Sequence, residues 1–262
     1  MGGRKSIFIT GAGSGIGRET ALLFANEGWY VGAFDINEQG IKSLESEIGK
    51  EGCFSQVMDV TDEKSVQSAA DAFAEKTGGK LDLLLNNAGI FTIGLYEMRQ
   101  LQDHHQVVDV NFKGCLNCIY HCLPYLKKTS NSRIINMSSI SSVYGIPEAS
   151  VYSSTKVAIS AMTEALDIEL EPYGIRVSDI KPPYVRTPMV DNAGNMKSFK
   201  MLSMIGGLTT ADKVAKTIWK AAHKHKLHWN IGLTSLMSLQ CWLLPFSKRF
   251  TVKLLTMPKI NN

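Results

Sequence analysis

The sequence lacks a long uninterrupted apolar segment, a marked excess of charge of one sign, and an internal repeat. Its 262 residues are 44% hydrophobic and 20% charged, with a net charge of +4. A charge this small gives no reason to expect a nucleic-acid partner. A chain of this length and ordinary composition is long enough to bury a full hydrophobic core.

The cellular compartment is inferred from the lack of a signal-peptide pattern and from the small, odd number of cysteines. The first apolar run starts near Ile7, is too short for the core of a signal peptide, and is followed by no small-residue cleavage site. The chain has 5 cysteines, an odd number, which without an export signal indicates reduced thiols. We therefore expect a cytoplasmic protein.

The C-terminal extension, residues 233–262, is apolar but is interrupted by Pro245 and by polar residues. It is too short and too polar to predict a membrane span. Three roles stay open for it, in this order of preference. It packs on a substrate pocket, it packs on a partner subunit, or it lies on a membrane surface.

Short apolar runs alternate with helical patterns along most of the chain. The expected strands cover residues 6–10, 29–35, 53–58, 81–85, 133–137, 176–181 and 229–231. The expected helices cover residues 18–27, 38–49, 62–77, 100–127, 151–173 and 211–225. Such alternation predicts parallel strands joined by right-handed crossovers, in a sheet covered by helices on both faces. We expect one doubly wound, Rossmann-type α/β domain over residues 1–262.

A glycine-rich turn joins the first strand to the first helix. Its pattern is Thr10-Gly11-x-x-x-Gly15-x-Gly17, and Ile16 stands where the general G-x-G-x-x-G fingerprint has its last glycine. Glycines in this context let the backbone approach a pyrophosphate, and the helix N-terminus offers free N–H groups to it. Taken alone, the pattern also fits a tight turn that binds nothing.

Asp35 ends the second strand, close to the interval of about 20 residues expected between the glycine turn and a ribose-binding acid. A carboxylate there accepts hydrogen bonds from the ribose hydroxyls of NAD and repels the 2′-phosphate of NADP. NAD is therefore favoured over NADP. Two observations oppose this interpretation: Asp35 also suits a helix cap, and Arg18 would suit a 2′-phosphate.

Tyr152 and Lys156 lie four residues apart in an expected helix, so both side chains leave the same face. A nearby cation lowers the pKa of a tyrosine from about 10, which makes the phenol a better base. Such a tyrosine takes a proton from an alcohol or gives one to a carbonyl. For this pair alone, a solvated surface pair is the simpler interpretation.

Several polar residues follow the expected strands directly. They are Gly11 to Gly17, Asp35, Asp59, Asn86 to Gly89, and Ser139. Ligands of parallel sheets bind beyond the carboxyl ends of the strands, so this convergence predicts a binding site at that edge.

The ordered set of motifs resembles the short-chain dehydrogenase/reductases, from Ser6 to about Met189. The motifs are the glycine turn, Asp59, Asn86-Asn-Ala-Gly89, Asn111, Ser139 and Tyr152-x-x-x-Lys156. The resemblance implies that Tyr152 is the general acid/base, that Ser139 binds the substrate oxygen, and that Lys156 lowers the pKa of Tyr152 and binds the nicotinamide ribose. It also implies that Asn111 holds a water in a proton relay to Lys156. Ser138 is left without a role.

The resemblance also implies which residues bind the dinucleotide. They are Gly11, Ser14, Gly15, Ile16, Gly17, Asp35, Asp59, Val60, Asn87, Ala88, Gly89, Tyr152, Lys156 and Thr187. The expected reaction is hydride transfer between NAD(H) and a lipophilic secondary alcohol or ketone. The alternatives are an NADP(H)-dependent carbonyl reductase and a non-catalytic dinucleotide-sensing protein, against which Ser139, Tyr152 and Lys156 argue. A homodimer or homotetramer is expected, because the family commonly pairs the helices that hold Asn111 and Tyr152.

Residues 182–209 are punctuated by proline and glycine and are rich in methionine, which predicts a mobile lid over an apolar substrate. Tyr144, Tyr184 and Met189 are the expected substrate contacts. The chain departs from the family at Pro183, where a glycine is usual, because proline fixes φ and removes an N–H. It also lacks the glycine-rich C-terminus common in the family, like relatives that act on lipophilic alcohols.

Cys115, Cys118 and Cys122 raise the question of a metal site, because thiolates at helical spacing bind zinc. These cysteines share one helical stripe with Asn111, which would turn them toward the sheet. Cysteine is commonly a small buried residue. We therefore predict that they pack in the core and that the protein has no metal site.

Overall fold

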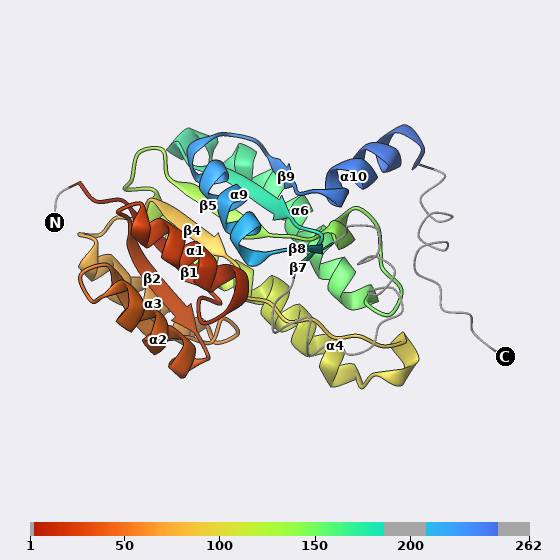
Figure 1. Ribbon diagram of the computed structural model, residues 1–262, viewed down its shortest axis with the longest axis horizontal. Coiled ribbons are helices and arrows are strands. Elements are labelled where there is room, and N and C mark those ends of the chain that lie inside the picture. Colours follow the sequence, from red (N-terminus) through yellow and green to blue (C-terminus); the bar gives the residue numbers. More distant parts are fainter. Residues whose placement is uncertain (1–2, 186–207, 246–262) are drawn as a thin grey trace.

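Seven parallel strands form the central sheet of the computed structural model, which describes residues 3–185 and 208–245 (Figure 1). The spatial order is β3-β2-β1-β4-β5-β6-β9. The bounds are β1 Ser6–Thr10, β2 Tyr30–Asp35, β3 Cys53–Val57, β4 Leu83–Asn86, β5 Arg133–Met137, β6 Arg176–Lys181 and β9 His228–Asn230. The predicted doubly wound sheet is confirmed.

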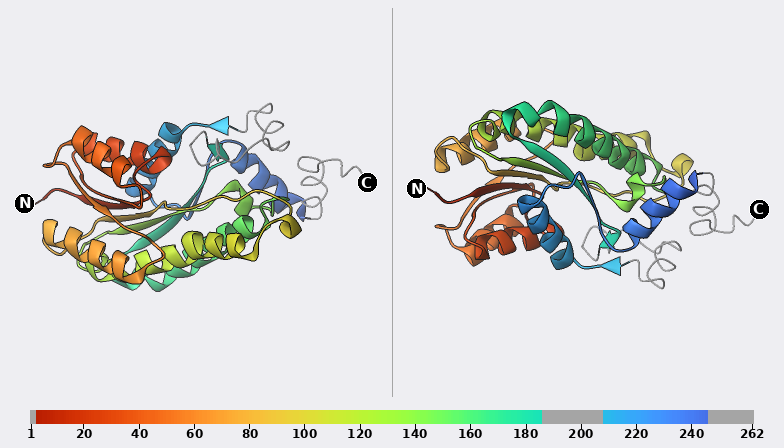
Figure 2. Two further views of the ribbon diagram at one scale, coloured as in Figure 1. Left: turned by 90° about the horizontal axis from the view of Figure 1, so that it is seen from below. Right: turned by 90° about the horizontal axis from the view of Figure 1, so that it is seen from above.

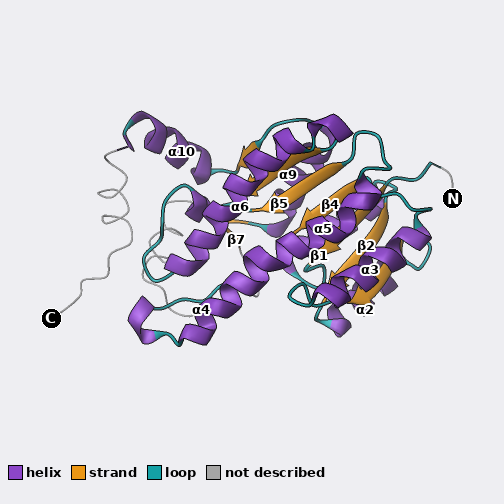
Figure 3. Ribbon diagram, turned by 180° about the vertical axis from the view of Figure 1, so that it is seen from behind, coloured by secondary structure: helices purple, strands orange, loops and turns teal. Residues whose placement is uncertain are grey.

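Helices cover both faces of this sheet, which Figure 2 shows edge-on. One layer holds α1 Gly15–Asn26, α2 Glu38–Ile48 and α9 Ala211–His223. The other holds α3 Glu63–Lys76, α5 Gly114–Leu126 and α6 Ser150–Glu169, with α4 Leu101–Val108 continuing α5 toward the viewer's lower left in Figure 3. Short 3₁₀ turns occur at Tyr96–Met98, Ile140–Ser142 and Glu171–Tyr173.

Aromatic residues fill the core on each face. The rings of Phe8 and Phe34 stack with centroids 3.8 Å apart, on the face covered by α3, α5 and α6. On the opposite face, Phe24 of α1 meets Trp219 of α9 at 4.8 Å between ring centroids. Because the chain moves outward in opposite directions from the β1–β4 pair, a crevice is expected where these two strands end.

The helix expected over residues 100–127 is interrupted by a turn of π-helix at Asp109–Lys113, which joins α4 to α5. Asn111 lies at the centre of this turn. A π-turn inserts one residue into the helical repeat, and such turns are frequent at functional sites. Hydrophobic periodicity did not predict it, because the apolar stripe continues through the turn.

Two further segments differ from expectation. The ends of the predicted lid pair as short parallel strands, β7 Tyr184–Val185 and β8 Leu208–Thr209, whereas residues 186–207 lie outside the described residues. The C-terminal extension begins with an unpredicted helix, α10 Leu233–Leu243.

Met237 of α10 is buried in a cluster with Ile140, Tyr144, Ile146 and Tyr184. Its place in the same cluster as Tyr184 agrees with the first of the three roles considered for the extension, because Tyr184 lines the cavity described below. Among the described helices, we find none with the length and apolar character needed to cross a membrane.

Candidate active site

A cavity of about 850 Å³ opens along the carboxyl edge of the sheet, from the end of β2 to the start of α6. It brings together most of the residues predicted from sequence. The predicted residues that line it are Gly11, Ser14, Gly15, Ile16, Asp35, Asp59, Val60, Asn87, Ala88, Gly89, Ser139, Tyr152, Lys156 and Tyr184. Gly17, Asn111 and Tyr144 lie behind this lining, and Thr187 and Met189 lie outside the described residues.

The glycine turn has the geometry that a pyrophosphate requires. Gly11 has φ +68° and Gly15 has φ +52°, values that side chains rarely permit. A Cβ on Gly17 would lie 2.1 Å from the carbonyl oxygen of Gly11, so only glycine fits. Ser14 makes no side-chain cap on α1, which leaves the first N–H groups of the helix available to an anion.

The turn is tied to β4 by side chains. Thr10 Oγ1 accepts hydrogen bonds from the backbone N–H groups of Asn87 (3.0 Å) and Ala88 (2.9 Å). Asn87 Nδ2 donates to the carbonyl oxygens of Thr10 and Gly11, both at 3.0 Å. Sequence reasoning assigned Asn87 to the cofactor; the structure shows that its side chain also braces the glycine turn.

Asp35 holds its carboxylate at the cavity by two backbone hydrogen bonds. Oδ2 accepts from Gly13 N at 2.8 Å and Oδ1 accepts from Asn37 N at 2.9 Å. Each carboxylate oxygen keeps a further lone pair for a ligand hydroxyl. Arg18, which would otherwise suit a 2′-phosphate, is paired with Glu47.

Ser139, Tyr152 and Lys156 meet at the other end of the cavity. Ser139 caps the 3₁₀ turn that follows β5, and its Oγ accepts from Ser141 N at 3.2 Å. The Tyr152 ring packs edge-on against Phe91, with centroids 4.6 Å apart. Lys156 is buried, and its Nζ donates to the carbonyl oxygen of Met137 at 2.8 Å and lies 5.5 Å from the Tyr152 ring centroid.

Burial is the largest influence on the pKa values of Tyr152 and Lys156. It raises the pKa of Tyr152 to about 12, although a hydrogen bond with Ser139 acts to lower it. It lowers the pKa of Lys156 to about 8. In this arrangement desolvation is the larger effect on the Tyr152 pKa, and the Lys156 ammonium donates to the Met137 carbonyl, so its role in lowering the Tyr152 pKa stays a prediction.

Asn111 reaches the site through the backbone rather than the cavity. Its Oδ1 accepts from Ile90 N at 2.7 Å and its Nδ2 donates to Ile90 O at 3.0 Å. A second, very small cavity of about 10 Å³ is lined by Asn111, Lys156 and Asn86, and this volume is close to the minimum that holds one water molecule. In the described residues, the buried Oδ1 of Asn86 has no hydrogen-bond partner, which fits a water at this position.

The three clustered cysteines pack in the core as predicted. Cys118 and Cys122 of α5 are 1% and 0% exposed and lie in the cluster beneath α3, α5 and α6. Burial raises the pKa of the Cys115 thiol to about 12. These thiols are therefore protonated core residues at neutral pH.

Comparison with known proteins agrees with this geometry. A model of the short chain dehydrogenase family matches residues 5–198. The chain is 35% identical over 220 residues to 3-oxoacyl-(acyl-carrier-protein) reductase FabG of Thermotoga maritima, covering 82% of this chain and 88% of the relative.

Two solved structures superpose over most of the chain. One is a 3-ketoacyl-(acyl-carrier-protein) reductase from Brucella melitensis complexed with NADH, with a TM-score of 0.79 and 29% identity, covering 87% of this chain and 96% of that one. The other is ElxO with NADPH bound, with a TM-score of 0.78 and 26% identity, covering 87% and 97%.

Gly17→Ala tests the glycine turn. The added methyl group would collide with the Gly11 carbonyl, so we expect NADH binding to weaken by at least about tenfold. The measurement is a fluorescence titration of NADH. Gly145→Ala is the matched control, because a Cβ there meets nothing within 4 Å. Equal NADH affinities of the two variants would contradict the assignment.

Lys156→Met tests the buried ammonium. The folded-state pKa of Lys156 is about 8, below its ordinary 10.5, so folding is penalised while both states are protonated. This penalty disappears as the pH rises from the folded to the unfolded pKa. Wild type should therefore gain about 2 kcal/mol in unfolding free energy relative to Lys156→Met between about pH 7 and about pH 10. Urea unfolding of both proteins at several pH values measures this difference. A difference that does not change with pH would contradict the lowered pKa of Lys156.

Proposed function

This chain belongs to the short chain dehydrogenase family, and we propose that it transfers a hydride between NAD(H) and a lipophilic secondary alcohol or ketone. The observation that carries the proposal is one continuous cavity that joins the glycine turn and Asp35 to Ser139, Tyr152 and Lys156. An acid/base group and a dinucleotide cradle on one surface are what such a reaction requires.

The residues present fit the dinucleotide. The glycine turn and the uncapped N-terminus of α1 would hold the pyrophosphate, and Asp35 the adenosine ribose. Asp59 and Val60 would border the adenine, and Lys156 the nicotinamide ribose. When bound, the nicotinamide supplies the hydride transfer.

Side chains of the protein would transfer the proton to or from the substrate oxygen. Ser139 and Tyr152 are hydrogen-bonded to each other, so together they can hold a substrate oxygen. With a pKa of about 12, Tyr152 is a neutral phenol at physiological pH, the form that donates a proton to a ketone. In the reverse direction the proton would leave through Lys156 and a water beside Asn111.

NAD is favoured over NADP by the charges at the ribose end. The Asp35 carboxylate is fixed there, and Arg18 is paired with Glu47 on the next helix. Among the described residues that line the cavity, the one cation is Lys156, at the opposite end. A 2′-phosphate would therefore meet an anion without a compensating cation.

The substrate end of the cavity is mainly apolar. Its described lining includes Phe91, Ile140, Ile146, Pro182, Pro183, Tyr184 and Val185. Met237 and Tyr144 pack behind this wall, so Tyr144 shapes the pocket from outside. The two reductases of 3-oxoacyl and 3-ketoacyl groups named above act on a ketone in an apolar chain, which supports the same class here.

We further propose that two copies of the chain associate through α5 and α6. Both helices expose large apolar side chains on their outer surface, namely Leu116 and Tyr120 of α5 and Val157 and Ile168 of α6. Burial of these side chains between two copies would remove the apolar area from water.

Tyr152→Phe tests the acid/base role. We expect the rate of NADH-dependent reduction of the best ketone in a panel from short-chain to steroid-sized to fall by about 10² to 10⁴. NADH affinity should change by far less than the rate, because the glycine turn, Asp35 and Lys156 still bind the dinucleotide when the phenol oxygen is removed. Absorbance of NADH measures turnover. A wild type that binds NADH tightly but reduces no ketone would favour the dinucleotide-sensing alternative.

Asp35→Asn tests the choice of cofactor. Removal of the charge should lower the ratio of kcat/KM with NAD(H) to that with NADP(H) by about tenfold or more. Asp62→Asn is the matched control, because Asp62 caps α3 away from the cavity and should leave the ratio unchanged. Higher wild-type efficiency with NADPH would overturn the preference for NAD and leave the acid/base assignment standing.

A further inference from the structure

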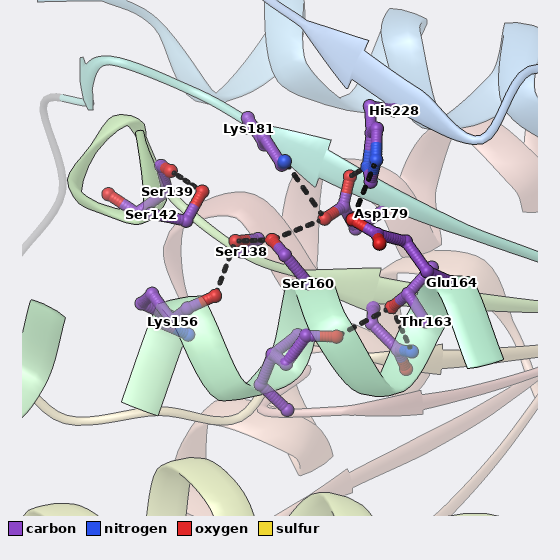
Figure 4. Close-up of polar contacts among 12 residues, drawn as sticks. Ser138, Ser139, Ser142, Lys156, Ser160, Thr163, Glu164, Asp179, Lys181 and His228 are labelled. Carbon is purple, nitrogen blue, oxygen red and sulfur yellow. Dashed lines mark hydrogen bonds and ion pairs between the residues drawn. The ribbon is translucent and has the colours of Figure 1, made fainter. Parts of the chain in front are cut away.

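A string of buried polar side chains runs beneath α6, from the end of β5 to the edge of the sheet (Figure 4). Ser138 Oγ donates to the carbonyl oxygen of Lys156 at 3.0 Å and lies 3.0 Å from Ser160 Oγ. Ser160 Oγ donates to Asp179 Oδ2 at 2.6 Å. We call Ser138, Ser160, Asp179, Lys181 and His228 the Asp179 network.

Asp179 of β6 is the centre of this network and is 0% exposed. Its Oδ1 lies 2.9 Å from His228 Nδ1, and its Oδ2 lies 3.6 Å from Lys181 Nζ. The other ring nitrogen of His228 lies 3.2 Å from the partly exposed Glu164. A buried carboxylate is unfavourable unless it is fully paired, and the proposed reaction does not use this one.

The direction of the hydrogen bonds follows from Asp179. An ionised carboxylate only accepts, so the single hydroxyl hydrogen of Ser160 points to Asp179. Ser160 can then only accept from Ser138. The single hydroxyl hydrogen of Ser138 is therefore shared between two acceptors, Lys156 O and Ser160 Oγ, each 3.0 Å from Ser138 Oγ, and this shared hydrogen bond fixes the Ser138 side chain.

One arm of the network therefore ends at the catalytic lysine. Two adjacent residues at the end of β5 bind it at separate points. Ser138 holds the Lys156 carbonyl, and the Met137 carbonyl accepts from Lys156 Nζ at 2.8 Å. The position of the ammonium in the cavity thus depends on how the α6 turn sits against β5.

The other arm ends near the substrate. His228 is the first residue of β9 and is paired in register with Asp179. The chain continues from β9 into α10, where Met237 is buried against Tyr144 and Tyr184. Asp179 thus also holds the edge strand that leads into α10, whose Met237 packs behind the wall of the substrate cavity.

We propose that Asp179 is a positioning residue that acts through both arms of the network. Through Ser160 and Ser138 it fixes the turn of α6 that carries Lys156, and through His228 it fixes the segment that leads into α10. The role of the Lys156 arm in catalysis rests on the function proposed above. The geometry of the two arms does not depend on that function.

The test compares three variants by two measurements that need no turnover. NADH affinity by fluorescence reports the Lys156 arm, and hydrogen exchange of residues 233–243 reports the α10 arm. Ser138→Ala should weaken NADH binding by about tenfold and leave the exchange unchanged. His228→Gln should accelerate the exchange by about tenfold and leave NADH affinity within about twofold. Asp179→Asn should do both.

Asp82→Asn is the matched control. This carboxylate accepts from Ser6 N at 2.8 Å and Ser6 Oγ at 3.3 Å, at the opposite ends of the strands. We expect it to lower the unfolding free energy without changing either readout. A second check is the Ser138→Ala and Asp179→Asn double variant, whose effect on NADH affinity should be smaller than the sum of the single effects.

The outcomes separate this proposal from the proposed function. If Asp179→Asn behaves like Asp82→Asn, the network is merely structural and the inference is overturned. If Asp179→Asn does not fold, the opposite responses of Ser138→Ala and His228→Gln decide, and equal responses overturn it. If wild type reduces no ketone, the enzymatic proposal fails, while NADH affinity and exchange still support or overturn the two arms.

Discussion

The hydroxyl of Thr10 joins the two strands on which the whole site depends. It accepts hydrogen bonds from the backbone at the end of β4, while Asn87 returns two hydrogen bonds to the end of β1. These strands are the pair from which the sheet grows in both directions. The crevice between their ends receives α1 on one side and α6 on the other, so the glycine turn and the Ser139, Tyr152 and Lys156 side chains share one cavity.

In the part of the chain that the structure describes, the buried charged side chains have polar partners. Lys156 is held by the carbonyl oxygen of Met137, and Asp179 by Ser160, His228 and Lys181. Both lie within the layer between α6 and the end of the sheet, and Ser138 connects them. Lys156 and Asp179 are both buried, which keeps the local dielectric low and the hydrogen bonds strong. These two buried charged groups thus both lie on the face of the sheet that α6 covers.

Local patterns predicted the sheet, its helices and most of the cavity lining, because strand ends and glycine turns have short-range signatures. They did not predict the π-turn at Asn111, which preserves the apolar stripe that periodicity detects. The roles of Ser138 and Asp179 depend on contacts between α6, β5 and β6, which are distant in sequence. The raised Tyr152 pKa was missed for a related reason: the spacing of Tyr152 and Lys156 shows their proximity but not their burial or the direction of the ammonium.

The strand order has a consequence for synthesis of the chain on the ribosome. The first 86 residues contain β3, β2, β1 and β4, which are neighbours in the sheet, and each later strand adds to the same growing edge. The strands can therefore be added to the sheet in the order of synthesis, whereas α1 receives its partner α9 only after residues 211–223 have been made. The glycine turn and Asp35, at one end of the cavity, are synthesised well before Tyr152 and Lys156 at the other end. Folding during synthesis would thus form the two ends of the cavity at different times.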